Sequence, residues 1–306
     1  MKITRMLFIF LCICSMIFLV VAKASALTIS CDASAQLDAT GTTNQQTATY
    51  PDEDPAEAIA ENAYRVTYPG EEVESTVAAT AAKAYGDTQG YIKGYASYSA
   101  TFSGWGYDLD GEAYATVTWS ESFDAYATGT YTWDFTILGG ILELTSSDEN
   151  AQMHAGYEFE IEANGSEIWY SKGELSAHYE SPSWQYQYSR SGVDLPHTIM
   201  LNYLGIFNLA YIYDEYDREA DLGYFSVGDP IEITYTMNFW ANDPFALGEA
   251  SAICNFYDPG GPSGPGGVSG GTLRGPGGAP VPEPATMLLL GTGILGFAGF
   301  RRRFRQ

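Results

Sequence analysis

Three glutamates at alternate positions, Glu158, Glu160 and Glu162, form the run of side chains best suited to catalysis. Apolar Phe159 and Ile161 separate them, so the pattern predicts a strand that presents all three carboxylates on its polar face. Same-face side chains on a strand follow one another at roughly 6.6–7 Å. Retaining glycosidases need two carboxylates about 5–5.5 Å apart, one as nucleophile and one as general acid. Glycoside hydrolysis is therefore the chemistry to consider for this run.

The glutamate run resembles the signature of laminarinase-type jelly-roll glycosidases, where E-x-D-x-E lies along one strand. The resemblance implies a hydrolase that uses Glu158 and Glu162. The sequence departs from that signature at Glu160, where aspartate is usual, and at Phe159, where a smaller aliphatic residue is usual. The solvated face of an amphipathic strand in a very acidic protein explains the run more simply. We therefore expect no enzymatic activity.

Other residues indicate binding. Trp105, Tyr107 and Trp240 could stack on sugar rings, as aromatic platforms do in carbohydrate-binding modules; the alternative is a tyrosine-rich surface without a ligand. Asp108 and Asp110 are the better candidates for a bound calcium ion, and no other cofactor is expected.

The acidic clusters do not follow a recognised metal-binding pattern. None of the acidic clusters, which include 52–54 and 214–221, matches the EF-hand loop. Asp110-Gly111 also fits a turn. His154 shares the polar face of Glu158 and is expected to be simply exposed.

Strands are expected to position these residues. All 23 tyrosines and all six tryptophans lie between residues 27 and 257, which is typical of strands. Apolar and polar residues alternate with period two in several segments: 27–38, 113–119, 127–137, 153–163, 231–239 and 250–256. Strands with one apolar face form antiparallel sheets that stack in pairs. The sequence therefore predicts an all-β fold, a single antiparallel β-sandwich or jelly-roll-like domain over 27–257.

Some segments are ambiguous. A capping-box pattern around Asp54 predicts a short helix over Pro55–Tyr64. Val73–Ala84 fits helix or strand, and we favour a strand paired with Tyr91–Phe102. Asn164-Gly165 predicts a hairpin turn, although Asn164 also begins a glycosylation sequon. The apolar segment Pro196–Tyr213 is interpreted as a buried strand.

Cys31 and Cys254 remain after removal of the predicted signal peptide, near the two ends of the domain. An even cysteine count in an exported chain favours one disulfide over free thiols. Both residues fall on the apolar faces of their strands, so the expected bridge lies inside the core. A zinc site would need more ligands than two distant cysteines provide.

The charge excludes whole classes of partner. Residues 27–280 hold 37 acidic and seven basic side chains, a formal charge of −30 (7 minus 37). Such a surface repels nucleic acid and anionic lipid headgroups and keeps the protein soluble.

The N-terminal segment predicts export. Lys2 and Arg5 precede the apolar run Met6–Ala22, and Ala24 and Ala26 occupy the cleavage positions of a secretory signal peptide. Residues 1–26 are thus expected to be removed by signal peptidase. The mature chain would then begin at Leu27.

The C-terminal segment predicts contact with a membrane. Residues 258–280 hold ten glycines and five prolines and are interpreted as a flexible linker. In the final segment, 281–306, an uncharged 16-residue run, Ala285–Phe300, precedes Arg301, Arg302 and Arg303. As a helix this run spans about 24 Å of a hydrocarbon core of about 30 Å. Arginine clusters stay on the cytoplasmic side, so an ordinary C-terminal anchor is one interpretation.

Pro282, Glu283 and Pro284 precede the apolar run, which is followed by the arginines. This three-part arrangement resembles the PEP-CTERM sorting signal. The resemblance implies recognition and removal of the segment by exosortase, a membrane transpeptidase of Gram-negative bacteria that make extracellular polysaccharide.

The sequence as a whole predicts an exported, non-enzymatic protein of the cell surface or the extracellular matrix, associated with biofilm or exopolysaccharide. It would stay anchored in the inner membrane by its C-terminal helix until processed. A carbohydrate- or calcium-dependent adhesin is the alternative, and a glycosidase through Glu158 and Glu162 is a second alternative.

Overall fold

The computed structural model describes residues 27–38, 42–50, 52, 55–67, 74–87, 91–101, 110–203, 206–243, 249–256 and 268–277. In this part of the chain the regular structure is β-strand, without an α-helix and without any helix long and apolar enough to span a bilayer. The strands are Leu27–Leu37 (β1), Thr42–Tyr50 (β2), Ala56–Thr67 (β3), Glu74–Gly86 (β4), Ile92–Ala100 (β5), Gly111–Asp124 (β6), Gly129–Ile137 (β7), Gly140–Ser146 (β8), Gln152–Ala163 (β9), Ser166–Glu180 (β10), Ser183–Gly192 (β11), His197–Asn202 (β12), Phe207–Tyr213 (β13), Tyr216–Phe225 (β14), Pro230–Asp243 (β15), Ala250–Asn255 (β16) and Val268–Arg274 (β17).

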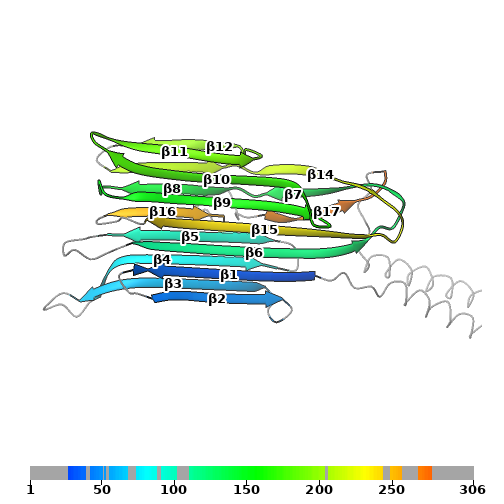
Figure 1. Cartoon of the computed structure of the whole chain (residues 1–306), viewed down its shortest axis with the longest axis horizontal. Helices are drawn as coiled ribbons and strands as arrows, with labels where there is room; N and C mark the ends of the chain where they lie inside the picture. Colours follow the sequence, from blue (N-terminus) through cyan, green and yellow to red (C-terminus); the bar gives the residue numbers. More distant parts are fainter. Residues whose placement is uncertain are drawn as a thin grey trace, which may run out of the picture.

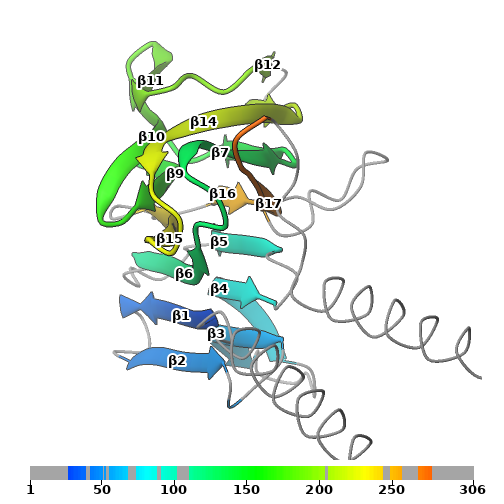
Figure 2. The same ribbon diagram turned by 90° about the vertical axis from the view of Figure 1, so that its right-hand side faces the viewer.

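The strands form two antiparallel sheets that face each other across one core, as Figures 1 and 2 show. The seven-stranded sheet has the order β11-β10-β9-β15-β6-β1-β2. In the ten-stranded sheet, β3 and β4 extend from one edge of β5, while β16 and β17 both pair with its other edge. The predicted all-β sandwich is confirmed.

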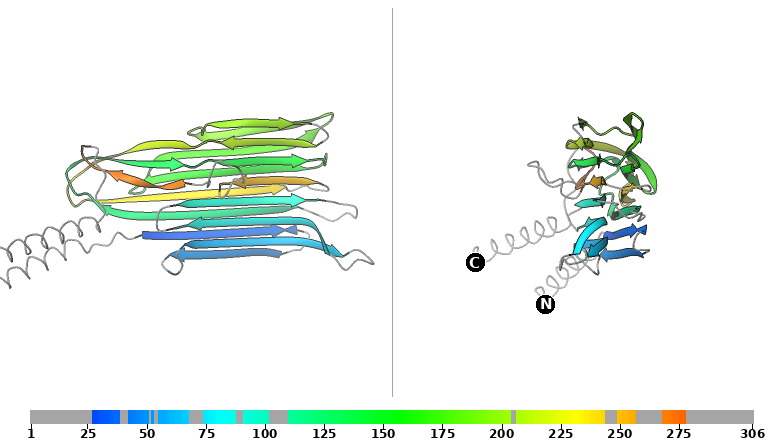
Figure 3. Two further views of the ribbon diagram at one scale, coloured as in Figure 1. Left: turned by 180° about the vertical axis from the view of Figure 1, so that it is seen from behind. Right: turned by 90° about the vertical axis from the view of Figure 1, so that its left-hand side faces the viewer.

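Several strands of the ten-stranded sheet lie end to end. β8 pairs with β13 and β16, while β7 pairs with β14 and β17. β16 and β17 therefore continue one line across the sheet, although they are separate in sequence (Figure 3). Gly139, with a φ of 96°, makes the break between β7 and β8. Only glycine adopts this backbone conformation easily.

The predicted alternation of inward and outward side chains is present along the long strands. In β5 and β7–β10 nearly every second residue is buried. The core is not uniform in thickness. Around β9, β15 and β16 it holds large rings, including Tyr157, Phe159, Phe239 and Phe256. Around β1, β3 and β4 it is mostly alanine, and Cα atoms of β1 come within 8 Å of those of β3 and β4.

Side-chain amides close the alanine-lined side of the sandwich, where β2 and β3 meet. Gln46 Oε1 accepts a hydrogen bond of 2.6 Å from the backbone N–H of Ile59. Asn62 Nδ2 donates to the carbonyl of Thr42 at 2.7 Å, and Asn44 Nδ2 donates to the carbonyl of Glu61. These bonds satisfy polar groups that an edge strand would otherwise leave free.

The turn predicted at Asn164-Gly165 is confirmed as the β9–β10 hairpin. Both residues have positive φ, 49° and 72°, as a type I′ turn requires. The Asn164 side chain also fastens the turn to β15, because Oδ1 accepts from the N–H of Glu232 at 2.7 Å and Nδ2 donates to the carbonyl of Pro230 at 3.2 Å.

The predicted pairing of Val73–Ala84 with Tyr91–Phe102 is confirmed as the β4–β5 hairpin, in which 78–86 pairs with 92–100. The interpretation of three other segments was wrong. Pro55–Tyr64 is not a helix: 56–67 is β3, because Ala56, Ala58 and Ala60 alternate into the core and pair with β4. The segment 196–213 holds two strands, β12 and β13, and only β13 is buried. Residues 268–274 of the expected linker form β17, which pairs with β7. Alanine and glycine carry weak preferences that tertiary pairing overrides.

The expected disulfide is absent, and Cys31 and Cys254 are free, fully buried thiols. Cys31 lies on β1, which faces β3 and β4, and its thiol donates to the carbonyl of Ala56 at 3.2 Å. Cys254 lies on β16, which faces β9 and β15. β1 and β15 are two strand positions apart, about 10 Å at the usual spacing. A disulfide needs Cα atoms about 4.4–6.8 Å apart.

Candidate functional site

The outer face of the seven-stranded sheet carries the glutamate run. Glu158, Glu160 and Glu162 alternate outward along β9, between β15 and β10, as the sequence predicts. Glu158 accepts hydrogen bonds from the Tyr170 hydroxyl at 3.1 Å and from Lys172 Nζ at 3.3 Å. Glu158 therefore has fixed partners on β10.

Several negative charges lie close together at the end of the glutamate run that contains Glu160 and Glu162. Glu162 lies directly opposite Glu167 of β10. Desolvation by burial, followed by the charges of Glu162, Glu167 and Glu158, raises the pKa of Glu160 above its ordinary value. The glutamate run lies along the outer face of a single strand. It offers hydrogen-bond acceptors to a ligand that lies on the sheet.

An aromatic platform lies beside the glutamates. Trp240 of β15 pairs with Tyr114 of β6 on one side and with Gly156 of β9 on the other. The indole covers Gly156, where an added Cβ would lie 2.3 Å from its Cζ2 atom. Lys172 Nζ lies 5.4 Å from the centre of the Trp240 ring, within the range of a cation–π contact. We call Tyr114, Gly156, Lys172 and Trp240 the Trp240 platform.

The surroundings of the Trp240 platform are polar. Asn238 Oδ1 accepts from Thr116 Oγ1 at 3.0 Å, and His154 Nδ1 lies 3.4 Å from a carboxylate oxygen of Glu174. A flat ring fixed by a glycine beneath it and flanked by donors and acceptors can bind a sugar, since ligand sites combine apolar surface with a few oriented polar groups.

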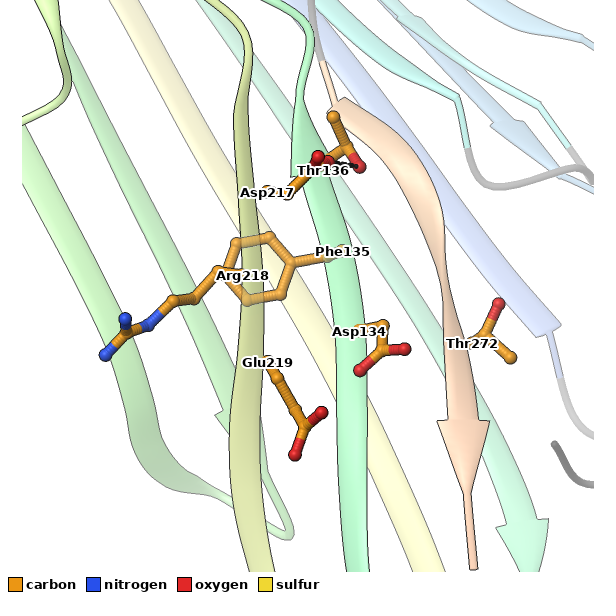
Figure 4. A pocket seen from close by; sticks show the side chains of 7 residues that line it. All are labelled: Asp134, Phe135, Thr136, Asp217, Arg218, Glu219 and Thr272. Atoms are coloured by element: carbon orange, nitrogen blue, oxygen red, sulfur yellow. Dashed lines mark hydrogen bonds between the residues drawn. The ribbon is translucent and has the colours of Figure 1, made fainter. Parts of the chain in front are cut away.

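A hollow of about 440 Å³ lies on the outer face of the other sheet, across β14, β7 and β17 (Figure 4). Asp134 lies directly opposite Glu219, and Asp217 accepts a hydrogen bond of 2.6 Å from Thr136. Arg274 pairs with Asp134 through Nε. Asp217 and Glu219 belong to the acidic segment 214–221. In the described part of the chain, no three His, Cys, Asp or Glu side chains are placed to hold a metal ion.

Other predicted site residues are placed as follows. Leu27 is the first residue of β1, and the carbonyl of Asp110 accepts from the N–H of Asp38 at 2.9 Å. A further set of predicted residues lies outside the described part of the chain: Ala24, Ala26, Trp105, Tyr107, Asp108, Pro282, Glu283, Pro284, Arg301, Arg302 and Arg303.

Sequence reasoning missed the edge of the sandwich formed by β11 and β12. Exposed apolar side chains gather there, among them Tyr186, Ile199 and Met200. A signal was present in the sequence, because residues 182–213 contain a single acidic residue, Asp194, in a chain with 38.

Comparison with known proteins gives one informative match. Residues 280–303 match the family model of the PEP-CTERM protein-sorting motif. No curated protein matches the chain.

Two similar solved structures belong to a virus. The infectious bursal disease virus Gx strain shares 11% identity over 86% of this chain and 68% of that chain, with a TM-score of 0.13. A mutant VP2 protein of the same virus, in T=1 particles, shares 11% identity over 85% of this chain and 63% of that chain, with a TM-score of 0.11. TM-scores this low do not indicate a shared fold or a shared function.

Proposed function

Because the chain carries a PEP-CTERM protein-sorting motif at residues 280–303, we propose that it is a non-enzymatic protein of the cell surface or extracellular matrix, associated with exopolysaccharide. The motif implies export, processing by exosortase and sorting to the surface. After export, the predicted C-terminal helix would hold the protein in the inner membrane until exosortase removes it.

The boundaries of the folded domain support this proposal. The first strand begins at Leu27, immediately after the predicted signal-peptidase site, and the last described strand ends at Arg274, shortly before the sorting motif. Both processing segments therefore lie outside the described strands, so the sandwich keeps all its described contacts after their removal. The acidic surface of 27–280 favours a soluble, extracellular product.

Replacing Pro282, Glu283 and Pro284 with alanine is expected to lower the amount of protein at the cell surface at least tenfold. The exosortase would no longer recognise the segment, and unprocessed chain would accumulate in the membrane. Surface labelling and intact mass measure the two pools. The wild-type surface form should have ends near Leu27 and near the PEP motif.

A matched control replaces Pro262 and Pro265, two prolines of the glycine-rich segment, with alanine and should leave delivery unchanged. Surface protein that retains its arginine tail at wild-type amounts would show that the segment is a plain anchor, and the proposal would be abandoned.

The Trp240 platform favours a second function, binding of a matrix glycan on the outer face of the seven-stranded sheet. The observation that supports glycan binding is the position of the indole over Gly156, beside Lys172 and Glu158. In this function Glu158 accepts hydrogen bonds from the sugar and does not act as a catalyst.

Trp240→Ala is expected to weaken retention on the host's exopolysaccharide at least tenfold, about 1.4 kcal/mol, because the stacking ring is lost. Trp240→Phe keeps a ring and should retain most of the binding. Tyr224→Ala, which removes an aromatic side chain that is 71% exposed on β14, serves as the matched control. Affinity electrophoresis measures retention, and equal mobility of wild type and Trp240→Ala in the glycan gel would exclude the platform.

A further inference from the structure

The β11–β12 edge of the sandwich is open, in contrast to the edge closed by amides at β2 and β3. In the described part of the chain β12 pairs with β13 alone and β11 with β10 alone. Around β12 the large apolar side chains are 40–55% exposed: Ile199 52%, Met200 55%, Leu201 40%, Tyr203 52% and Ile206 42%. We call β12 with Tyr203 and Ile206 the open edge.

The open edge is apolar on both sides of its sheet. Ile199 and Leu201 lie opposite Tyr211 and Leu209, so they belong to the inner face of the sandwich. Met200 points to the outer face. Natural edge strands usually carry lysine, proline or a bulge that prevents pairing with another chain. β12, with the sequence HTIMLN, has none of these in its regular register with β13.

The backbone of β12 is arranged to accept another strand. The N–H of Asp214 bonds the carbonyl of Pro196 at 3.0 Å, and His197 pairs with Tyr213. In an antiparallel ladder, hydrogen-bonded and non-hydrogen-bonded pairs alternate. The N–H and C=O groups of Ile199 and Leu201 therefore point away from β13, toward the free side.

Charge identifies the partner. The chain has a formal charge of −24, so two copies repel each other over most of their surfaces. Residues 182–213 carry little charge: Asp194 is their single acid, Arg190 their single lysine or arginine, and these two side chains form an ion pair. A second copy can therefore approach here without repulsion between carboxylates.

We infer that the open edge is a self-association surface, where β12 pairs antiparallel with β12 of a second copy. A twofold axis at Met200 would place Ile199 opposite the partner copy's equivalent of Leu201, and the reverse. About four interchain backbone hydrogen bonds would form by the antiparallel pattern. The same patch meets itself in such a dimer, so the exposed side chains on both faces of β12 become buried together. The ten-stranded sheets of two molecules join into one.

Cysteine cross-linking in the exported full chain tests this pairing. The two Met200 residues would form the central non-hydrogen-bonded pair, with Cα atoms about 4.5 Å apart, which suits a disulfide. Met200→Cys is expected to give at least ten times more disulfide-linked dimer on mild oxidation than Val227→Cys. Val227 is 65% exposed and lies outside the patch. The native Cys31 and Cys254 are buried and do not compete.

Ile199→Pro, added to Met200→Cys, should lower the cross-linked fraction at least fivefold. Proline removes an N–H that faces the free side and leaves the β12–β13 bonds intact. Leu201→Lys, also added to Met200→Cys, should act alike by placing like charges at the interface. Exported amount and protease resistance report folding of each variant.

Equal cross-linking of the Met200→Cys and Val227→Cys chains would overturn the inference. Cross-linking that survives both Ile199→Pro and Leu201→Lys would overturn it as well, since random collision would then explain the product. If Met200→Cys stays monomeric while the open-edge variants lose retention on exopolysaccharide, the patch binds glycan and self-association is rejected.

Discussion

Raising the pH from 8 to 11 is expected to remove several kcal/mol of stability and to unfold the sandwich. The reason is a set of buried protons. Burial raises the pKa of Cys31 to about 12, with smaller contributions from Asp32 and Glu57. Burial also raises the pKa of Cys254 and those of Tyr157, Tyr213 and Tyr235 above their ordinary values.

Stability falls as the pH rises because the folded and unfolded chains bind different numbers of protons. Below pH 9 the thiols are neutral in both states, so the full stability is present. Above pH 9 the unfolded chain releases thiol protons, and above pH 10 phenol protons, while the folded chain keeps them. Each such group lowers the free energy of unfolding by about 1.4 kcal/mol per pH unit. Five groups acting together approach the whole stability of a typical domain, about 5–15 kcal/mol.

Urea unfolding at pH 8, 10 and 11 under reducing conditions measures this loss, and absorbance at 295 nm reports phenolate. The matched variant replaces Cys31 and Cys254 with alanine and should lose less stability between pH 8 and 10, because the thiols titrate about one pH unit before the phenols and account for most of the loss in this range. A urea midpoint that stays constant to pH 11 would contradict the burial of these protons. So would phenolate formation of all tyrosines in the intact fold.

The same buried residues show how much of the fold the sequence could predict. Alternation identified the faces of β1, β6, β9 and β15 because each has one apolar side, and both cysteines were placed correctly inside the core. Whether the two cysteines lie close enough to form a disulfide could not be predicted. Periodicity says which face a residue occupies and nothing about which strands become neighbours, and β6 separates β1 from β15.

Predictions from local sequence patterns were wrong where pairing with a distant strand determines the secondary structure. The capping-box pattern before Ala56 is a true helix signal in isolation, yet β4 supplies a complete ladder for 56–67. In β17 the register with β7 shifts between Ser269 and Thr272. Gly271 lies within this irregular part and packs against Trp133, so this glycine allows the backbone to lie close to the indole ring. No local pattern reveals such a contact.

The candidate sites were predictable to different degrees. The PEP-CTERM motif is local and was identified from its own residues, with a family model that matches 280–303. The Trp240 platform required knowledge of neighbouring strands, because Gly156 and Lys172 reach Trp240 only through the β15–β9–β10 order. The open edge required the sheet order as well, since β12 is exposed only because it comes last.

Gly94→Ala is expected to destabilise the sandwich by about 3 kcal/mol or more, at the upper end of the range for overpacked cores. Gly94 lies on the inner face of β5, and an added Cβ would lie 1.8 Å from Cε2 of Phe239 in the opposite sheet. The ring cannot move aside easily, because Phe159 and Phe256 lie at 5.5 and 5.9 Å between ring centres. The backbone is fixed too, since the carbonyl of Gly94 accepts from the N–H of Phe256 at 2.8 Å.

Urea unfolding compares this variant with Gly165→Ala, which places its Cβ in open space and carries only the strain of a φ of 72°. That control should cost about 1 kcal/mol. If the clash with Phe239 is the cause, Phe239→Leu should cost less in the Gly94→Ala background than in the wild type, by at least about 1 kcal/mol. Equal costs for Gly94→Ala and Gly165→Ala would mean that the two sheets are not in close contact at this point. The cost of Gly94→Ala would then come only from the backbone, and the conclusion that β5 packs tightly against the Phe239 ring of β15 would be wrong.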